Sequence, residues 1–230
     1  MTREKTALII LHQRRSSIGD LGLKLKHRGY KIDVKKPSLG EKLPTNMDNH
    51  DVAIMYGGPM SANDNNIAIK YETDWISTAL ESKKPFLGIC LGAQMLANNL
   101  GGTVQRAADR SHEIGFFEII PNLDGQKIFQ QQKTFFQWHN EGFTVPNSCK
   151  ILAHGTKFHQ QAFQYQNAYG IQFHPEVNLR MHLAWLYFAG YMLKKKGAQT
   201  QIKQLNLRLK HGKKINLWLD HFLDNYLLKL

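Results

Sequence analysis

Short apolar runs alternate with amphipathic segments along the first half of the chain. Strands are expected over residues 6–13, 30–34, 51–56 and 85–89, where apolar residues predominate. Apolar residues three and four positions apart, which indicate helices, follow the first, third and fourth of these runs. Strands that alternate with helices form a parallel sheet covered on both faces. The pattern therefore predicts an α/β fold with a doubly wound, mostly parallel sheet and flanking helices.

The expected helices have recognisable ends and inner faces. Ser17 is the expected N-cap of the first helix, which ends near Gly29. The third helix follows Cys90 and is closed by Gly101 and Gly102. The inner face of the second helix carries Ile69, Ile76, Ala79 and Leu80, with Trp75 nearby.

After residue 103 the pattern changes to short β segments such as "GFFEIIP", "KILAHG" and "YGIQFH". These segments predict a small antiparallel β part, followed by two or three C-terminal helices. The last helix is expected over residues 216–230, and packing of its apolar face on the main domain is favoured over docking another protein. That face carries Leu219, Phe222, Leu223, Tyr226, Leu227 and Leu230.

Length and composition are those of an ordinary globular protein. The chain has 230 residues, of which 42% are hydrophobic and 21% charged, without an internal repeat or long linker. We expect a main domain over residues 1–193 and a basic helical extension over residues 194–230 packed on it. No early segment is organised as a signal peptide, and the apolar run at residues 7–11 is too short to span a membrane. A cytoplasmic location without membrane association is therefore expected.

The formal net charge of +12 is unevenly distributed. Residues 177–219 contain nine basic residues and no acidic one. Such a tract can attract nucleic acid, anionic lipid or an acidic partner, or it can be the solvated face of a helix. No aromatic stripe or nucleic-acid motif accompanies it, which favours the solvated face and argues against a nucleic-acid partner. The tract includes Lys194, Lys195, Lys196, Lys210, Lys213 and Lys214.

The two cysteines occur in different contexts. Cys90 and Cys149 provide neither a disulfide framework nor the spacing of zinc ligands, so no metal is expected. Cys90 lies in "GICLG" between a predicted strand and helix, which is the cysteine counterpart of a nucleophile elbow. The positive end of the following helix favours the thiolate. A packed cysteine in a glycine-rich turn would have the same local sequence. Cys149 has no paired glycines and is expected to be a packed or semi-exposed thiol.

A base and a group that orients it are also present. In "YGIQFHPEV", His174 ends a predicted strand and Glu176 follows two residues later. Residues two apart in an extended segment point the same way, so the carboxylate can hold the imidazole. In "YGGPMSAND", the turn at Gly57 and Gly58 can expose backbone N–H groups to a developing oxyanion. Together these residues favour a nucleophilic role for Cys90.

Four motifs follow one another in the chain: Gly-Gly-Pro, Gly-Ile-Cys-Leu-Gly-Ala-Gln, Trp-His-Asn-Glu and Phe-His-Pro-Glu, beginning at Gly57, Gly88, Trp138 and Phe173. In this order and over residues 6–190, the chain resembles the class I (triad-type) glutamine amidotransferases, whose sheet is flavodoxin-like. The segments "GGPMSAND", "EIGFFEI" and "FQWHNEGF" are similar to the stand-alone, GMP-synthase-like branch of that family.

The resemblance implies a role for each motif. Cys90 would attack the side-chain amide carbon of glutamine, form a γ-glutamyl thioester and release ammonia. His174 would take the thiol proton and later activate water, while Glu176 orients the ring. The backbone N–H groups of Gly58 and Leu91 would form the oxyanion hole. No cofactor is implied.

The substrate-binding residues implied by the resemblance are Gln94 and the backbone near Asn140 and Glu141. Many relatives have His-Gly-Asp where this chain has His-Asn-Glu, so the side chain of Asn140 can reshape the pocket. His139 is an alternative base, but it has no close acidic partner in its motif. We therefore interpret it as a structural histidine of the pocket wall.

Several functions stay open at this stage. The chain has no nucleotide-binding loop and no second domain large enough for a synthase. Ammonia could pass to a separate synthetase subunit, or the protein could be a free-standing hydrolase of γ-glutamyl amides or peptides. A non-enzymatic module that binds through the basic C-terminal region is the third alternative. The sequence gives neither the acceptor nor the oligomeric state.

Overall fold

The computed structural model describes residues 3–229. These residues form one mixed sheet with the strand order β2-β1-β3-β4-β11-β10-β9-β6-β7, with β5 and β8 attached at its side. The strands are β1 (Thr6–Ile10), β2 (Lys31–Lys35), β3 (Val52–Met55), β4 (Phe86–Ile89), β5 (Thr103–Arg106), β6 (Glu113–Pro121), β7 (Thr134–His139), β8 (Glu141–Thr144), β9 (Lys150–Gly155), β10 (Gln160–Tyr165) and β11 (Ala168–Ile171).

The sheet has a parallel half and an antiparallel half. Strands β2, β1, β3, β4 and β11 pair in parallel, whereas β11, β10, β9, β6 and β7 pair antiparallel in that order. Of the parallel strands, β1, β3, β4 and β11 are almost continuously apolar, as expected for strands buried on both faces, whereas β2 at the edge carries two lysines and an aspartate. The predicted α/β class, with a mostly parallel sheet, flanking helices and an antiparallel part, is confirmed.

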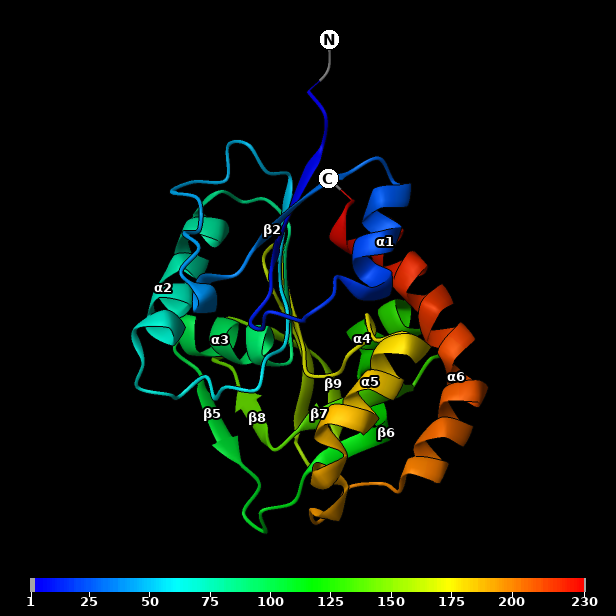
Figure 1. Cartoon of the computed structure of the whole chain (residues 1–230). Coiled ribbons are helices and arrows are strands. Elements are labelled where there is room, and N and C mark those ends of the chain that lie inside the picture. The colour runs from blue at the N-terminus through cyan, green and yellow to red at the C-terminus, as the bar shows by residue number, and fades with distance from the viewer. Residues whose placement is uncertain (1–2, 230) are drawn as a thin grey trace.

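Helices cover both faces of the sheet (Figure 1). The helices are α1 (Gly19–His27), α2 (Ile67–Glu81), α3 (Leu91–Asn99), α4 (Leu123–Phe129), α5 (Leu179–Ala189) and α6 (Gln201–Phe222). Helices α2 and α3 lie on one side of the sheet, and α1 and α6 lie on the other (Figure 1). Short 3₁₀ segments occupy Pro37–Leu39 and Gly190–Lys194, and a π-helical turn at Leu223–Leu227 continues α6. Within residues 3–229, no helix has both the length and the apolarity needed to cross a membrane.

The start of the first helix differs from the prediction. Ile18, not Ser17, holds the N-cap position of α1, and Ser17 accepts a hydrogen bond from the Gly19 amide (3.3 Å) instead. Gly19 adopts a φ of 55°, and a side chain there would lie 2.3 Å from the backbone oxygen of Glu176. The helix therefore begins where the chain passes closely beneath the segment that contains Glu176.

The C-terminal helix is longer than predicted. It begins at Gln201 rather than at residue 216, with the Thr200 side chain as its N-cap. The sequence pattern failed because two inward positions carry polar residues: Gln204 is fully buried and Arg208 is 7% exposed. These residues interrupt the apolar periodicity on which the expected boundary depended.

The apolar end of this helix contributes to the core. Trp218 stacks on Phe129 with ring centroids 5.5 Å apart, and it meets Phe135 edge-on at 4.8 Å. The expected face includes the buried residues Leu219, Phe222, Leu223 and Leu227 and the half-buried Tyr226, while Leu230 lies outside the described residues.

Candidate active site

The candidate residues follow three neighbouring strands of the parallel half. Gly57 comes after β3, Cys90 directly after β4, and His174 after β11. Strand β4 pairs with β3 on one side and β11 on the other. Because the carboxyl ends of parallel strands meet at one edge of the sheet, this topology brings the three segments together.

Cys90 occupies a sharp turn between β4 and α3. It is the N-cap residue of α3 and has φ 52° and ψ −105°, a conformation that L-residues rarely adopt. The flanking glycines permit close packing: a side chain at Gly88 would lie 2.5 Å from the Gly92 oxygen, and one at Gly92 would lie 2.1 Å from the Met55 oxygen. The turn thus presents a 5% exposed thiol at the positive end of a helix.

His174 and Glu176 form a buried pair. The Nδ1 atom of His174 lies 2.8 Å from Oε1 of Glu176, and each side chain is 3% exposed. Nδ1 therefore donates to the carboxylate, which leaves Nε2 for another group. Among the described residues, Nε2 of His174 has no hydrogen bond of ordinary geometry.

Gly57 shows how close the imidazole and the thiol are. A Cβ at this position would lie 2.7 Å from Cε1 of His174 and 3.3 Å from Cβ of Cys90. Both side chains therefore pack against the same glycine, and any side chain at position 57 would intrude on them.

The electrostatics favour a protonated imidazole. Burial alone would lower the pKa of His174, but the charges of Glu176 and then of Cys90 raise it to about 10. These neighbours therefore favour the charged form of the ring.

The backbone around Glu176 is tied to two helices. The Asp20 amide at the start of α1 donates to the Glu176 oxygen (2.9 Å). From α6, Nη1 of Arg208 donates to the Val177 oxygen (2.8 Å). Glu176 is thus positioned from both the first and the last α-helix of the described chain.

The two expected oxyanion-hole residues lie in contact. A Cβ at Gly58 would lie 3.0 Å from Cδ2 of Leu91. Among residues 3–229, neither the Gly58 nor the Leu91 amide donates a hydrogen bond. Leu91 is the first residue of α3, so its N–H has no partner within the helix.

The three expected substrate-binding residues lie close together. Nε2 of Gln94 donates to the Glu141 oxygen (2.9 Å) and to Oε1 of Gln172 (3.2 Å). The Glu141 carboxylate accepts from Oγ of Ser61 (2.8 Å), and the half-buried Asn140 lies in the turn between β7 and β8. Gln94 therefore uses its amide nitrogen to hold the turn between β7 and β8. Glu141 connects that turn to the loop after β3, which contains Gly57, Gly58 and Ser61 and is called the glycine loop below.

His139 has an acidic partner that its own motif does not contain. Its Nε2 atom lies 3.1 Å from Oε2 of Glu113 on β6, and its Nδ1 donates to the Glu141 oxygen (2.8 Å). Gln161 also donates to Glu113 (2.9 Å). Sequence spacing gave no signal for this pair, because Glu113 reaches His139 through antiparallel pairing of β6 and β7.

A further buried pair, which sequence reasoning missed, lies behind the glycine loop. Nε2 of His12 is 2.7 Å from Oε2 of Glu72, and both side chains are completely buried. Glu72 on α2 lies three residues after Ile69 and four before Ile76, so helical spacing already placed it on the inner face.

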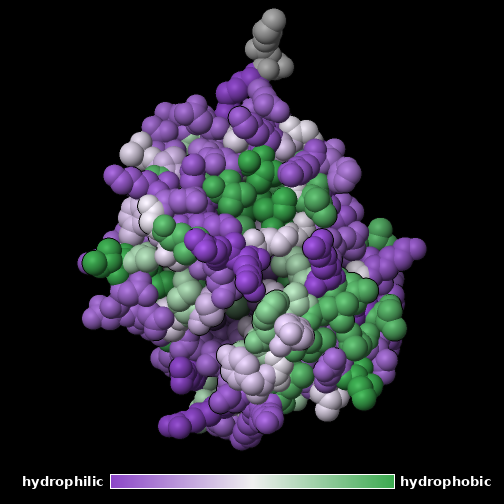
Figure 2. All heavy atoms as spheres, viewed as in Figure 1, coloured by the Kyte–Doolittle hydropathy of each residue, from purple (hydrophilic) through white to green (hydrophobic). Residues whose placement is uncertain are grey.

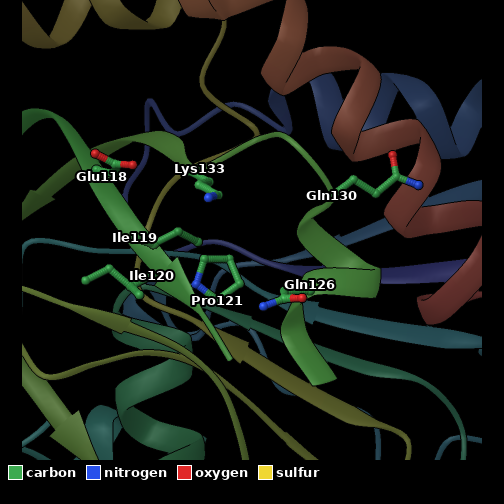
Figure 3. Close-up of a pocket in the computed structure, with 7 residues that line it drawn as sticks. All are labelled: Glu118, Ile119, Ile120, Pro121, Gln126, Gln130 and Lys133. Atoms are coloured by element: carbon green, nitrogen blue, oxygen red, sulfur yellow. The ribbon is translucent and has the colours of Figure 1, made fainter. Parts of the chain in front are cut away.

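One pocket of the described residues lies outside this site. A surface pocket of about 550 Å³ lies between β6 and α4 (Figure 3). It is lined by Glu118, Ile119, Ile120, Pro121, Gln126, Gln130 and Lys133. None of the candidate catalytic residues lines it. Within residues 3–229, no group of three or more His, Cys, Asp and Glu side chains could hold a metal ion.

An α/β sheet that gathers a thiol, an imidazole and a carboxylate at its central strand ends is organised like a cysteine-dependent enzyme. Residues 16–192 match the family model Glutamine amidotransferase class-I, and the chain belongs to this family. The resemblance drawn from the four sequence motifs is confirmed.

Relatives support the same family. Over 181 residues, the chain is 29% identical to the "putative glutamine amidotransferase-like protein YfeJ" of Salmonella typhimurium, covering 74% of this chain and 75% of the relative. It is 32% identical over 156 residues to a glutamine-hydrolysing GMP synthase subunit of Saccharolobus solfataricus, covering 66% and 80% respectively.

Solved structures agree. A glutamine amidotransferase from Thermotoga maritima superposes with a TM-score of 0.88 at 28% identity, covering 99% of this chain and 100% of that one. A glutamine amidotransferase from Methylobacillus flagellatus has a TM-score of 0.87 at 22% identity, covering 96% and 92%, and supports the fold.

Proposed function

We propose that the protein hydrolyses the side-chain amide of glutamine, with Cys90 as nucleophile, His174 as acid and base, and Glu176 as the group that orients His174. The observation that carries this proposal is the buried 2.8 Å pair of His174 and Glu176, packed with Cys90 against Gly57. Family membership supports glutamine as the substrate.

The reaction balances with these groups alone. The Cys90 thiolate attacks the amide carbon, and the carbonyl electron pair moves to oxygen. When that pair returns, the C–N bond breaks and the leaving nitrogen takes the proton of His174, giving ammonia and a γ-glutamyl thioester. His174 then takes a proton from water, whose oxygen attacks the thioester. The thioester C–S bond breaks, the glutamate formed loses its carboxyl proton to water, and the thiolate is left beside the protonated His174 for the next cycle.

Two backbone amides complete the proposed chemistry. The N–H groups of Gly58 and Leu91 would stabilise the oxyanion formed in both steps, where one such donor contributes about 100- to 1000-fold in rate. Gln94 and the backbone of Asn140 and Glu141 would bind the substrate. Asn140 is the position that can favour other γ-glutamyl amides over glutamine.

A separate synthetase subunit is the proposed recipient of the ammonia. The relative from Saccharolobus solfataricus is named as one subunit of GMP synthase, which supports this arrangement. Helix α5 begins directly after the segment with Glu176 and exposes an apolar stripe, where apolar residues gather in Figure 2. The stripe consists of Leu179, Leu183, Tyr187 and Phe188, and Tyr191 of the following 3₁₀ segment continues it. An exposed apolar face of this kind is typical of a protein contact.

The test compares the two cysteines. Purified wild type, Cys90→Ala and Cys149→Ala are incubated with glutamine and with γ-glutamyl amides, and free ammonia and trapped thioester are measured. Cys90→Ala should lose about a thousandfold or more in rate, whereas Cys149→Ala should keep the wild-type rate. A fully active Cys90→Ala variant would refute the role of Cys90. If the wild type acts only on other γ-glutamyl amides, those compounds and not glutamine are the substrates.

A further inference from the structure

The loop that carries Gly57 and Gly58 rests on the buried pair of His12 and Glu72. His12 follows β1, Glu72 lies on α2, and both side chains are completely buried. A Cβ at Gly58 would lie 2.8 Å from Cβ of His12, so the loop backbone packs directly on this histidine.

The proton on His12 is located by its neighbours. Nδ1 of His12 lies 3.2 Å from the Gly57 oxygen, and a carbonyl oxygen can only accept, so Nδ1 donates. Nε2 lies 2.7 Å from Oε2 of Glu72, a close buried contact that does not have the geometry of a hydrogen bond. Glu72 thus contacts the ring at Nε2 while Nδ1 faces the Gly57 oxygen. The backbone of His12 is held separately, because its oxygen accepts from Oγ of Ser38 (2.8 Å).

Peptide geometry transmits this contact to the active site. The Gly57 carbonyl and the Gly58 N–H belong to one planar trans peptide, so they point in opposite directions. When His12 draws the Gly57 oxygen to one side, the Gly58 amide is turned to the other. The loop contacts Cys90 and His174 through Gly57 and Leu91 through Gly58.

We propose that His12 and Glu72 are positioning residues, which orient the Gly57–Gly58 peptide so that the Gly58 amide can stabilise the oxyanion. This inference rests on the proposed function, because it assigns two positioning residues to the proposed hydrolysis. Two glycines leave the peptide otherwise free to rotate, since neither carries a side chain that would restrict it. A buried contact in this position fixes one orientation before the substrate arrives.

Leucine and amide substitutions separate positioning from simple packing. Leucine at either position keeps the volume but removes the polar contact, and the double variant His12→Leu/Glu72→Leu leaves no unpaired buried charge. His12→Asn keeps a donor at the place of Nδ1. Glu72→Gln can donate to Nε2 and so keeps the proton of His12 on Nδ1.

Two reactions of Cys90 serve as readouts. Glutamine hydrolysis passes through an oxyanion, whereas alkylation of the thiolate by iodoacetamide does not. All variants carry Cys149→Ala, so that only Cys90 reacts. The leucine variants should lose about 10- to 100-fold in kcat, with KM and the alkylation rate unchanged. This loss is smaller than the about 100- to 1000-fold effect of removing an oxyanion donor, because the Gly58 amide is misoriented and not removed. The two amide variants should recover most of this loss.

A matched control breaks a similar pair elsewhere. Nε2 of His50 lies 3.0 Å from Oδ2 of Asp33, away from the glycine loop, and His50→Gln should leave both reactions unchanged. Leucine variants with wild-type kcat would overturn the positioning role while leaving the proposed function intact. Equal losses of hydrolysis and alkylation would show a structural role only and would overturn it as well. A wild type that alkylates but hydrolyses no γ-glutamyl amide would overturn both proposals.

Discussion

Gly57→Ala tests how closely the proposed catalytic groups are packed. The new methyl group would lie 2.7 Å from Cε1 of His174, where ordinary contact begins at 3.4 Å, so the ring must move by about 0.7 Å. Gly57 does not have a left-handed φ, so alanine adds no backbone strain. The substitution therefore changes the space beside the imidazole and the thiol and little else.

The size of the effect follows from that displacement. A misplacement of about 1 Å at a reacting group can cost about 100-fold in rate, so kcat for glutamine should fall about 10- to 100-fold. This corresponds to about 1.4 to 2.7 kcal/mol of transition-state stabilisation. Gly190→Ala is the matched control, because no atom lies within 4 Å of the position its methyl group would take.

The assay is steady-state ammonia release together with a thermal melt of each variant. We expect Gly57→Ala to melt near the wild type and to be slow, and Gly190→Ala to match the wild type in both. A Gly57→Ala variant with wild-type kcat/KM would show that His174 and Cys90 do not need their packed arrangement, and the proposed geometry would be refuted.

Three further predictions concern the site and the core. Glu176→Gln removes the charge that raises the pKa of His174, so the ring should lose its proton at a lower pH than in the wild type. The kcat for glutamine should fall, by about 10⁴-fold at most. A pH profile of Cys90 alkylation that equals the wild-type profile would contradict this prediction. His182 is buried, which lowers its pKa from 6.5 to about 4, so the unfolded chain takes up a proton first as pH falls. Stability should therefore drop by about 3 kcal/mol between pH 6.5 and 4, and urea titrations should show less of this drop in His182→Gln. Trp218→Ala should cost about 3–5 kcal/mol of unfolding free energy, whereas the neighbouring and 58% exposed Leu217, changed to alanine, should cost little; equal midpoints would disprove the packing argument.

The fold was predictable where apolar periodicity was complete. Strands β1, β3 and β4 are buried runs, and α2 has Ile69, Ile76 and Ala79 on its inner face as expected. The pattern failed in α6, because Gln204 and Arg208 occupy inward positions, where each donates a hydrogen bond to a backbone oxygen. Periodicity reports burial only when buried residues are apolar.

The site was predictable where local sequence controls geometry. Cys90 follows a strand and precedes a helix, as predicted. The side chains of His174 and Glu176 also meet, although β11 ends at Ile171 and Glu176 lies in a turn rather than in the expected extended segment. The partners of His12 and His139 could not be predicted in this way. Glu72 lies sixty residues after His12, and Glu113 lies on another strand, so only the tertiary structure joins each pair.

The contact between Arg208 and the Val177 oxygen has a consequence for biosynthesis. Helix α6 leaves the ribosome only after every strand of the sheet has been made, and early segments fold first during translation. A nascent chain that already contains the thiol, the ring and the carboxylate still lacks this clamp. Under the proposed function, glutamine turnover should therefore begin only once α6 has docked against the segment that contains Glu176 and Val177.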